Sequence, residues 1–575
     1  MENSQPMPTP VLRSADVVAL RRLVTRGGRE RIDLLRTAAA RPIRSASALR
    51  EWHDLLLFVL AHPRDETERA WAADAQRAVA VLVESWRARA SRSYEGLLNS
   101  GIARAPIEGN YSLSLVRWLL RQWPNAVFLT QVDAPLDEVQ DVLRVLVLPV
   151  EQELLEWGFD DADSLLASLF GSATTTWLPR LLALLDSLPA NERVRAHLFA
   201  RLRLYVRVTG NGADCDLATA MVSARAVGGP DEFHPDGLQR EVDLPALMLL
   251  PPVRARRLGA NATQRLINSA RTILAIMGRE TDPVTHASAV SCFDMGRGLT
   301  IALFALAPSY RLAFDSYVGF MAFRNGAPLA YGGAWIFPGR SKIGINIFPS
   351  QRGGESAWFF AQLLRLYHSE FGVDRFEAEN YQLGYGNPEG LRSGAYWFYY
   401  RLGFRPMTNA LRRLAAREAN RLAARAGYEV PKAVLNTLVE AGLELVLRES
   451  EGPVLDTAAL TDAVRQHIVQ RYHGDRGLAM STALRRARAI LREAHEPRHA
   501  IAGTKPTAAE TIALHLWSLP LDLVGDLELW SRSEKRLLVK LLRTKGEPTE
   551  TRHQRLLRTH RRLLGAWARA LQAEK

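Results

Sequence analysis

Cysteine is nearly absent from this sequence, since only Cys215 and Cys292 occur among 575 residues. Two cysteines cannot form a disulfide framework, and they are too few for a zinc site built on thiolates. His234 lies in a loop-like, acidic segment (227–245) but has no partner at ligand spacing, so we interpret it as a surface residue. We therefore expect a reduced, cytoplasmic protein without a metal site.

Long hydrophobic runs are also missing. No stretch reaches 18 apolar residues without a charge, and the closest, residues 165–179, is too short and too polar to cross a membrane. The first 18 residues are polar and lack the apolar core of a signal peptide. The sequence predicts no transmembrane insertion.

Lysine is scarce, with seven of the 74 basic residues, and the positive charge is unevenly distributed. Residues 530–575 hold 13 Lys and Arg against four Glu, so nine of the thirteen net positive charges lie in that end of the chain. A basic amphipathic helix over 551–572 is typical of segments that bind nucleic acid, anionic membranes or acidic partners. It is equally typical of a helix that docks on its own domain with its charges solvated. A tRNA or an acidic partner at 530–575 is therefore one of two alternatives.

The periodicity of apolar residues divides the chain into helical and extended regions. A length of 575 residues favours two to four domains. Apolar residues recur every three to four positions over 49–62, 68–90, 136–157 and 200–208, which predicts a mostly helical region from about 14 to 280. Asp65, followed by Glu68, is a helix-start signal. Helical patterns return from about 410 to the end.

Between these regions, short β-rich runs are separated by Gly, Pro, Asn and Asp. They predict strands within 287–293, 298–307, 316–326, 327–337 and 341–349. Asn325-Gly326 is the pair that tight hairpin turns prefer, so the two strands beside it should be antiparallel neighbours. The fold class is therefore α+β.

The segment PSQRGGESAWFF (349–360) places an Arg and two glycines between a strand and an apolar helix over 357–372. The free N–H groups of a first helical turn and the helix dipole both favour an anion in such a loop. Glycines permit the close backbone approach that a phosphate cradle needs. An ordinary strand-to-helix connection is the alternative interpretation.

The context of this loop resembles the GNAT superfamily of acyl-CoA-dependent N-acyltransferases. In that family a central strand leads into a loop of the pattern Gln/Arg-x-x-Gly-x-Gly/Ala, and a Tyr-x-x-x-Gly-Phe sequence follows on a later helix. Here Gln351 and Gly354 match the first pattern, with Ser356 in place of the final small residue. Tyr399, Gly403 and Phe404 match the second. The resemblance covers about residues 315–410.

The resemblance implies acyl transfer from acetyl-CoA or another acyl-CoA to an amine on a small molecule or a protein. It implies that Tyr399 protonates the leaving thiolate and that Ile347 and Phe348 contact the pantetheine arm through their backbone. The loop would hold the coenzyme A pyrophosphate. The implied coenzyme-binding residues are Ile347, Phe348, Gln351, Arg352, Gly353, Gly354 and Ser356.

The general base is less well defined. Glu377 and Glu379 lie two residues apart and so face the same side of a predicted strand, where one carboxylate can raise the pKa of the other. A solvated strand face is the alternative for both glutamates, and a core aromatic is the alternative for Tyr399. Trp335, Tyr385 and Trp397 are candidates for an acceptor pocket or for core positions.

We predict three domains: a helical domain over 1–255, a GNAT-like domain over 256–410 with a mixed, mostly antiparallel sheet, and a helical domain over 411–575. The family's pair of helices between its first two strands has no counterpart between 307 and 316, so the acceptor is undefined. Two other functions fit the same fold, namely an aminoacyl-tRNA-dependent transferase and a non-catalytic scaffold.

Overall fold

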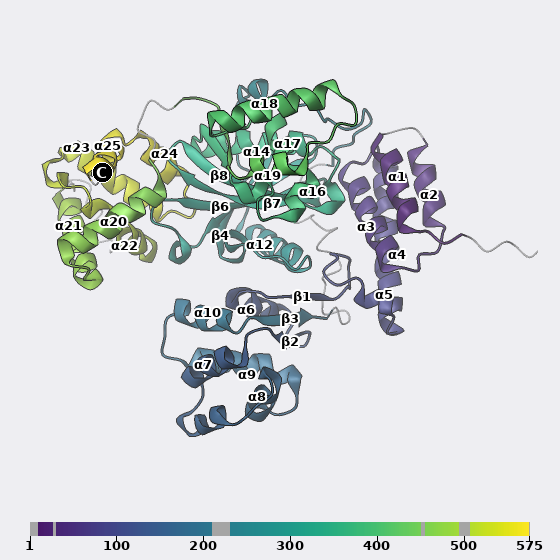
Figure 1. The fold of residues 1–575 in the computed structure, drawn as a ribbon, viewed down its shortest axis with the longest axis horizontal. Helices are drawn as coiled ribbons and strands as arrows, with labels where there is room; N and C mark the ends of the chain where they lie inside the picture. The colour runs from purple at the N-terminus through teal and green to yellow at the C-terminus, as the bar shows by residue number, and fades with distance from the viewer. Residues whose placement is uncertain (1–9, 27–29, 210–230, 450–454, 494–506, 574–575) are drawn as a thin grey trace, which may run out of the picture.

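The computed structural model describes residues 10–26, 30–209, 231–449, 455–493 and 507–573. The fold is α+β, with a large central sheet between helical flanks, as the sequence predicts (Figure 1). The N-terminal helices lie on one side of the sheet, the C-terminal helices lie on the opposite side, and a small unit with its own sheet lies below. No helix among the described residues is both long and apolar enough to span a membrane.

The first helical unit forms where the apolar periodicity predicts it. Asp65 caps its longest helix by accepting a hydrogen bond from the Glu68 N–H (2.8 Å), so this start signal is confirmed. The helices of the unit are α1 (Ser14–Arg26), α2 (Arg31–Ala39), α3 (Ala46–Ala61), α4 (Glu66–Ala88) and α5 (Arg92–Glu95).

The second unit contains a three-stranded antiparallel sheet in the order β1-β3-β2, so the prediction of an all-helical N-terminal flank is wrong there. Within 200–208 the last five residues form β3, because Leu204, Val206 and Val208 alternate with less buried residues at period two. The strands are β1 (Ile107–Gly109), β2 (Val127–Val132) and β3 (Leu204–Val208). The helices are α6 (Leu113–Gln122), α7 (Leu136–Leu146), α8 (Ala162–Phe170), α9 (Trp177–Ser187) and α10 (Glu192–Arg201).

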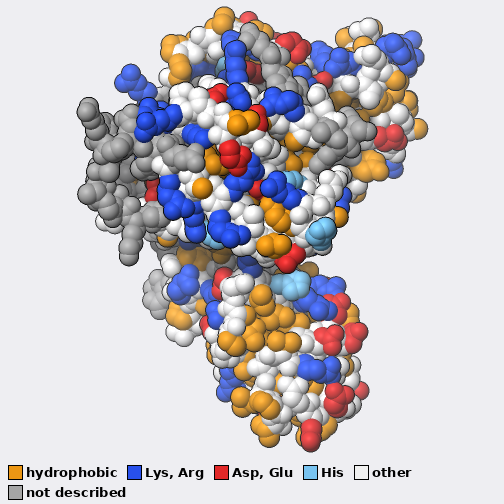
Figure 2. Space-filling view, turned by 90° about the vertical axis from the view of Figure 1, so that its left-hand side faces the viewer, with side chains coloured by type: hydrophobic (Ala, Val, Ile, Leu, Met, Phe, Trp, Pro, Cys, Tyr) orange, Lys and Arg blue, Asp and Glu red, His pale blue; other side chains and the backbone are white. Residues whose placement is uncertain are grey.

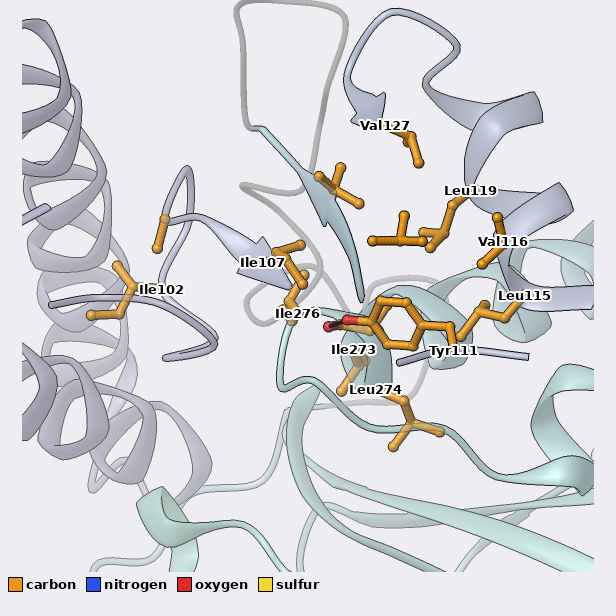
Figure 3. Close-up of a cluster of buried hydrophobic side chains, with 14 of the residues drawn as sticks. Ile102, Ile107, Tyr111, Leu115, Val116, Leu119, Val127, Ile273, Leu274 and Ile276 are labelled. Atoms are coloured by element: carbon orange, nitrogen blue, oxygen red, sulfur yellow. Dashed lines mark hydrogen bonds between the residues drawn. The ribbon is translucent and has the colours of Figure 1, made fainter. Parts of the chain in front are cut away.

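This small unit is attached to the central one through an apolar cluster around α12 (Ala260–Ala275) (Figure 3). Leu115 and Leu119 of α6 face Ile273 and its neighbours on α12. The Tyr111 hydroxyl donates to the Ala275 carbonyl oxygen at 2.9 Å, which fixes the contact in one register.

The central sheet has eight strands in the order β10-β11-β9-β8-β7-β6-β5-β4, antiparallel except for β8 and β9. Side chains along its strands point alternately into two cores. In β5, Ala302 and Phe304 face the N-terminal side, and Ile301 and Leu303 face α14. The strands are β4 (Ala287–Asp294), β5 (Leu299–Leu306), β6 (Ser316–Arg324), β7 (Ala327–Phe337), β8 (Arg340–Ile347), β9 (Arg375–Ala378), β10 (Arg405–Pro406) and β11 (Leu443–Val446).

The hairpin between β6 and β7 turns at Asn325 and Gly326, as predicted. Both residues have positive φ (46° and 82°), the geometry of the turn that Asn-Gly favours. The Asn325 side chain also donates to the Ala61 carbonyl oxygen at 3.0 Å, so the hairpin tip is attached to the end of α3.

Helices on one face of the sheet follow β8 and β9. The chain 388–401 forms two helices, because Gly394 adopts the left-handed conformation between them. The helices of the central unit, beside α12, are α13 (Asp282–Thr285), α14 (Ser356–Phe371), α15 (Asn380–Leu383), α16 (Pro388–Ser393), α17 (Ala395–Arg401), α18 (Asn409–Ala424) and α19 (Lys432–Val439).

The C-terminal flank, predicted to be all-helical, also supplies a strand. Leu443 and Leu445 of β11 are buried, and β11 pairs with both β9 and β10, so the sheet extends past residue 410. The remaining helices are α20 (Thr457–Tyr472), α21 (Arg476–Glu493), α22 (Ala508–Asp522), α23 (Arg532–Lys545), α24 (Thr551–Thr559) and α25 (Arg561–Ala573).

Candidate functional site

The only parallel strand pair among the described residues leaves the last part of β8 without a partner strand, and we call this unpaired edge of β8 the gap. β8 and β9 are in register from Arg340 opposite Arg375 to Lys342 opposite Glu377. Beyond that point β8 continues to Ile347, whereas β9 ends at Ala378 and the chain turns into α15. Five residues of β8 therefore lack a neighbouring strand on that side.

The backbone at the end of β8 is directed into this gap. The Phe348 N–H donates to the Leu329 carbonyl oxygen at 3.1 Å, which makes these two residues a hydrogen-bonded antiparallel pair. Alternate residues of a strand direct their backbone groups to opposite edges, so those of Ile347 and Ile345 face away from β7 and toward the gap.

This geometry separates the two residues that the resemblance assigned to the pantetheine arm. Ile347 has the orientation that such a contact needs. Phe348 does not, because its N–H bonds Leu329 and its carbonyl oxygen accepts from the Gln351 N–H at 2.9 Å. The Phe348 backbone is therefore already bonded within the chain.

The outer side of the predicted anion loop is exposed. Gly353 has φ +80°, and no atom lies within 4 Å of the position that a Cβ would occupy there. Arg352 is exposed and donates to a carboxylate oxygen of Glu389 at 2.7 Å, which lowers the pKa of Glu389. Ser356, half-buried, begins α14. The exposed side therefore carries an arginine, a glycine and a helix N-terminus.

The inner side of the loop is seated on the N-terminal helices. The Gln351 amide donates to the Leu57 carbonyl oxygen (3.3 Å), and a Cβ on Gly354 would lie 3.2 Å from Phe58 and from His62. Both residues are buried, so they hold the loop against α3 and do not face solvent.

Arg21 of α1 binds the same loop, and sequence reasoning missed it. Its Nη2 donates to the carbonyl oxygens of Pro349 (3.0 Å), Ser350 (2.7 Å) and Arg352 (3.0 Å). The two partners are more than 320 positions apart in the chain. No local pattern marks such a contact, because its only sequence signal is an arginine on a helix rich in arginine.

A buried charge cluster lies directly behind the start of α14. The Glu355 carboxylate contacts Arg324 at 2.6 Å, and both side chains are fully buried. It also pairs with Arg297 and accepts from the Gln239 N–H at 2.7 Å. Burial alone would raise the pKa of Glu355, but Arg297 and Arg324 outweigh this effect and lower it.

His234 belongs to this cluster. The prediction of a surface residue, made from its loop-like segment, is wrong. His234 is 4% exposed and lies 3.1 Å from an Arg297 nitrogen. Burial and the Arg324 charge lower its pKa to about 4, so it is neutral at physiological pH. Among the described residues, no three His, Cys, Asp or Glu side chains come together in a way that could hold a metal ion.

Tyr399 lies on α17, inside an aromatic cluster. It is 2% exposed, and its ring centroid is 5.3 Å from those of Phe360 and Phe404. Its hydroxyl has no hydrogen-bond partner among the described residues, and burial raises its pKa. The hydroxyl therefore stays protonated, as a proton donor must, but a substrate atom reaches it only if the cluster opens.

Glu377 and Glu379 both pair with cations of β8. Glu377 lies 3.9 Å from Arg340, and Glu379 lies 3.2 Å from Lys342. Glu377 lies on β9, but Glu379 follows the last residue of β9 and precedes α15, so the predicted strand does not extend to Glu379. Glu379 is exposed and Glu377 is partly exposed. The structure therefore pairs both carboxylates with cations of β8.

The predicted aromatic candidates lie at different depths. Trp335 is 37% exposed and stacks on Tyr317 with a centroid distance of 4.2 Å. Tyr385 is 53% exposed, and Trp397 is half-buried against Tyr396 and Tyr400. None of the three is a fully buried core position.

The basic C-terminal helices dock on the chain itself. Leu557, Leu563 and Trp567 are fully buried, and Arg558 of α24 pairs with Asp374. Arg555 donates to the carbonyl oxygens of residues 369 and 370. In Figure 2, Lys and Arg side chains on the upper body are interspersed with acidic and apolar ones. Of the two alternatives for the amphipathic segment 551–572, the structure shows the one in which the segment docks on its own chain.

No protein-family model matches the chain, and no curated protein or solved structure is significantly similar to it. A function must therefore be inferred from the chain's own geometry and from the resemblance in residues 315–410.

Proposed function

We propose that this protein transfers an acyl group from an acyl-CoA to an amine. The observation that carries the proposal is the early end of β9, which leaves the backbone of Ile345 and Ile347 on an unpaired edge of β8, shortly before the N-terminus of α14. A ligand with amide groups can pair with such an edge as an added strand does. The pantetheine arm of coenzyme A is an extended chain with amide groups.

The pyrophosphate would bind at the exposed side of the loop. Gly353 leaves room for a close approach to its backbone, and the N-terminus of a 16-residue helix favours negative charge. Arg352 would exchange its contact with Glu389 for a phosphate oxygen. Gln351 and Gly354 act indirectly in this proposal, because they hold the loop on α3.

The chemistry needs a free amine and a proton for the leaving group. The amine nitrogen attacks the thioester carbonyl carbon, the C–S bond breaks, and the coenzyme thiolate takes a proton. Tyr399 is the proposed donor of that proton. Glu379 or Glu377, directly or through water, is the proposed acceptor of the proton that the amine loses.

Titration calorimetry with acetyl-CoA and decanoyl-CoA tests the donor site. We expect binding by the wild-type protein and at least tenfold weaker binding by Arg352→Glu and Ser356→Trp. Arg392→Glu, an exposed charge change on α16, is the matched control and should bind as the wild type does. Absence of binding by the wild type to either ligand would refute the proposal.

A non-catalytic role is the second candidate, because the Tyr399 hydroxyl is enclosed by aromatic rings. In that case acyl-CoA binds, but no amine in a screen of small molecules and lysine peptides is acylated. An aminoacyl-tRNA donor is favoured only if the protein binds tRNA in a salt-sensitive manner and no acyl-CoA. These outcomes distinguish the three functions.

A further inference from the structure

A cavity of about 970 Å³ lies between the C-terminal helices and the segment that leads into β6. Its volume is near the upper end of the range of about 300–1,000 Å³ that small-molecule sites occupy. Its walls come from α10, from residues 309–315 and from α20, α21 and α22, so a ligand there would contact three parts of the chain.

Most of the cavity wall is apolar. Phe314 forms a rigid part of it, because its ring is buried edge-on against Phe337 and Trp567. Leu312 is 41% exposed in the absence of a ligand. The apolar residues of the wall are Leu312, Ala313, Phe314, Ala458, Val464, Met480, Ile512, Leu516, Leu519 and Pro520.

Asp315 places a carboxylate in this apolar wall. Among the described residues it has no ion pair, and its hydrogen-bond partner is the hydroxyl of Thr457, at the start of α20. Burial raises the pKa of Asp315. An incompletely neutralised carboxylate in an apolar site is costly, and a cation placed beside it would remove much of that cost.

Three cations that act on Asp315 already have carboxylate partners. Arg340, Lys342 and Lys545 all act electrostatically on Asp315. Arg340 pairs with Glu377 and Asp456, Lys342 pairs with Glu379, and Lys545 pairs with Glu550. Arg193 and His515 also line the cavity. None of these side chains forms an ion pair with Asp315 among the described residues.

We propose that this cavity binds a small molecule with an apolar body and a protonated amine, with the amine against Asp315. The apolar wall supplies the area that the body buries, and the carboxylate fixes the orientation of the head. Thr457 and Thr461, one helical turn apart on α20, offer hydroxyl groups beside the head.

The cavity is distinct from the proposed acyl-CoA site. Ser316, next to Asp315, is opposite Ile336, and Ile336 is opposite Ser341 at the beginning of β8. Ile347 lies six residues further along β8, which corresponds to roughly 20 Å. The cavity therefore lies at the opposite end of β8 from the loop that would hold the pyrophosphate.

Calorimetry with decylamine, decan-1-ol and decanoate, each below its aggregation concentration, tests the proposal on the full chain. We expect the wild type to bind decylamine at least tenfold more tightly than decan-1-ol and to bind decanoate most weakly. Asp315→Asn should remove the preference for the amine and leave decan-1-ol binding unchanged. Ala458→Trp, which fills the cavity from its exposed side, should abolish binding of all three.

Asp462→Asn is the matched control, because Asp462 is an exposed carboxylate on α20 that pairs with Arg465. It should bind the three probes as the wild type does. The proposal is overturned if the wild type binds none of the probes, or if decylamine shows no preference over decan-1-ol. The wild-type series decides the matter even if a variant fails to fold, and neither outcome depends on whether the protein binds acyl-CoA.

Discussion

Replacing Glu355 by Gln should destabilise the start of α14 more than any exposed charge change near the site. Glu355 is the counterion of Arg324 and Arg297, and the side chains of Glu355 and Arg324 are both fully buried. A glutamine can still accept the Gln239 N–H, so the variant removes the charge and little else. What remains is a buried guanidinium without a counterion.

The magnitude follows from that burial. Removing one partner of a buried ion pair costs about 3–5 kcal/mol, because the other charge stays desolvated. An exposed pair such as Arg352–Glu389 contributes less than about 1 kcal/mol. The double variant Glu355→Gln/Arg324→Met should recover part of the loss, since it leaves no unpaired charge.

The pH dependence has a definite sign. The pKa of Glu355 is lowered in the folded protein, so its contribution is fully present above the unfolded pKa near 4.5. It is lost as the pH falls through the folded pKa, below 4.5. The difference in stability between the wild type and Glu355→Gln should therefore be constant from pH 6 to 8 and should shrink at lower pH.

Native-state hydrogen exchange of the peptide over 356–371 is the appropriate assay, because a chain with several units does not unfold in one step. If α14 exchanges through an opening that breaks the cluster, 3–5 kcal/mol corresponds to exchange roughly 150- to 5,000-fold faster. Glu389→Gln is the control and should change the exchange rate of this peptide less than tenfold. Equal protection in Glu355→Gln and wild type would refute the reasoning.

Three further changes test other contacts. Tyr399→Phe removes a buried hydroxyl that has no partner among the described residues, so thermal unfolding should show no loss of stability. If Tyr399 is the acid, kcat for acyl transfer falls while acyl-CoA affinity is kept. An unchanged kcat would assign Tyr399 to packing alone. Lys545→Met leaves Glu550 buried without its closest counterion and should destabilise the docking of α23 and α24 by about 3–5 kcal/mol. Hydrogen exchange in both helices should then be faster, and unchanged exchange would contradict this prediction. Arg21→Ala frees three loop carbonyls and should raise exchange in residues 349–355 by about tenfold or more, whereas Arg22→Ala, an exposed neighbour, should not.

The elements that sequence reasoning predicted well are those with strong local signals. The strands from β4 to β8 have their turn residues between them, and Asn325-Gly326 specifies its hairpin by backbone conformation alone. Helix α14 has an unbroken apolar pattern and ends at Gly372 in the left-handed conformation. In each case the information lies within a few residues.

The features that sequence reasoning missed depend on distant parts of the chain. β3 and β11 are short, and each becomes a strand because it pairs with strands far away in sequence. The sequence around His234 has the composition of an exposed loop, but the side chain is buried and contacts Arg297, which is 63 positions away in the chain. Tertiary contacts decided these positions, and local propensity did not.

The contacts of the loop support the proposal that its exposed side binds an anion. Arg21 takes up the carbonyl oxygens of Pro349, Ser350 and Arg352, which otherwise would present negative dipole ends to a ligand. The charge of Glu355 is directed inward at Arg324 and Arg297, so it does not oppose an anion at the start of α14. The N–H groups of the first turn of that helix have no partners within the helix itself. Three carbonyl oxygens of the loop are therefore bound on the side of the N-terminal helices, and in our proposal these helices support the anion site although they need not touch the ligand.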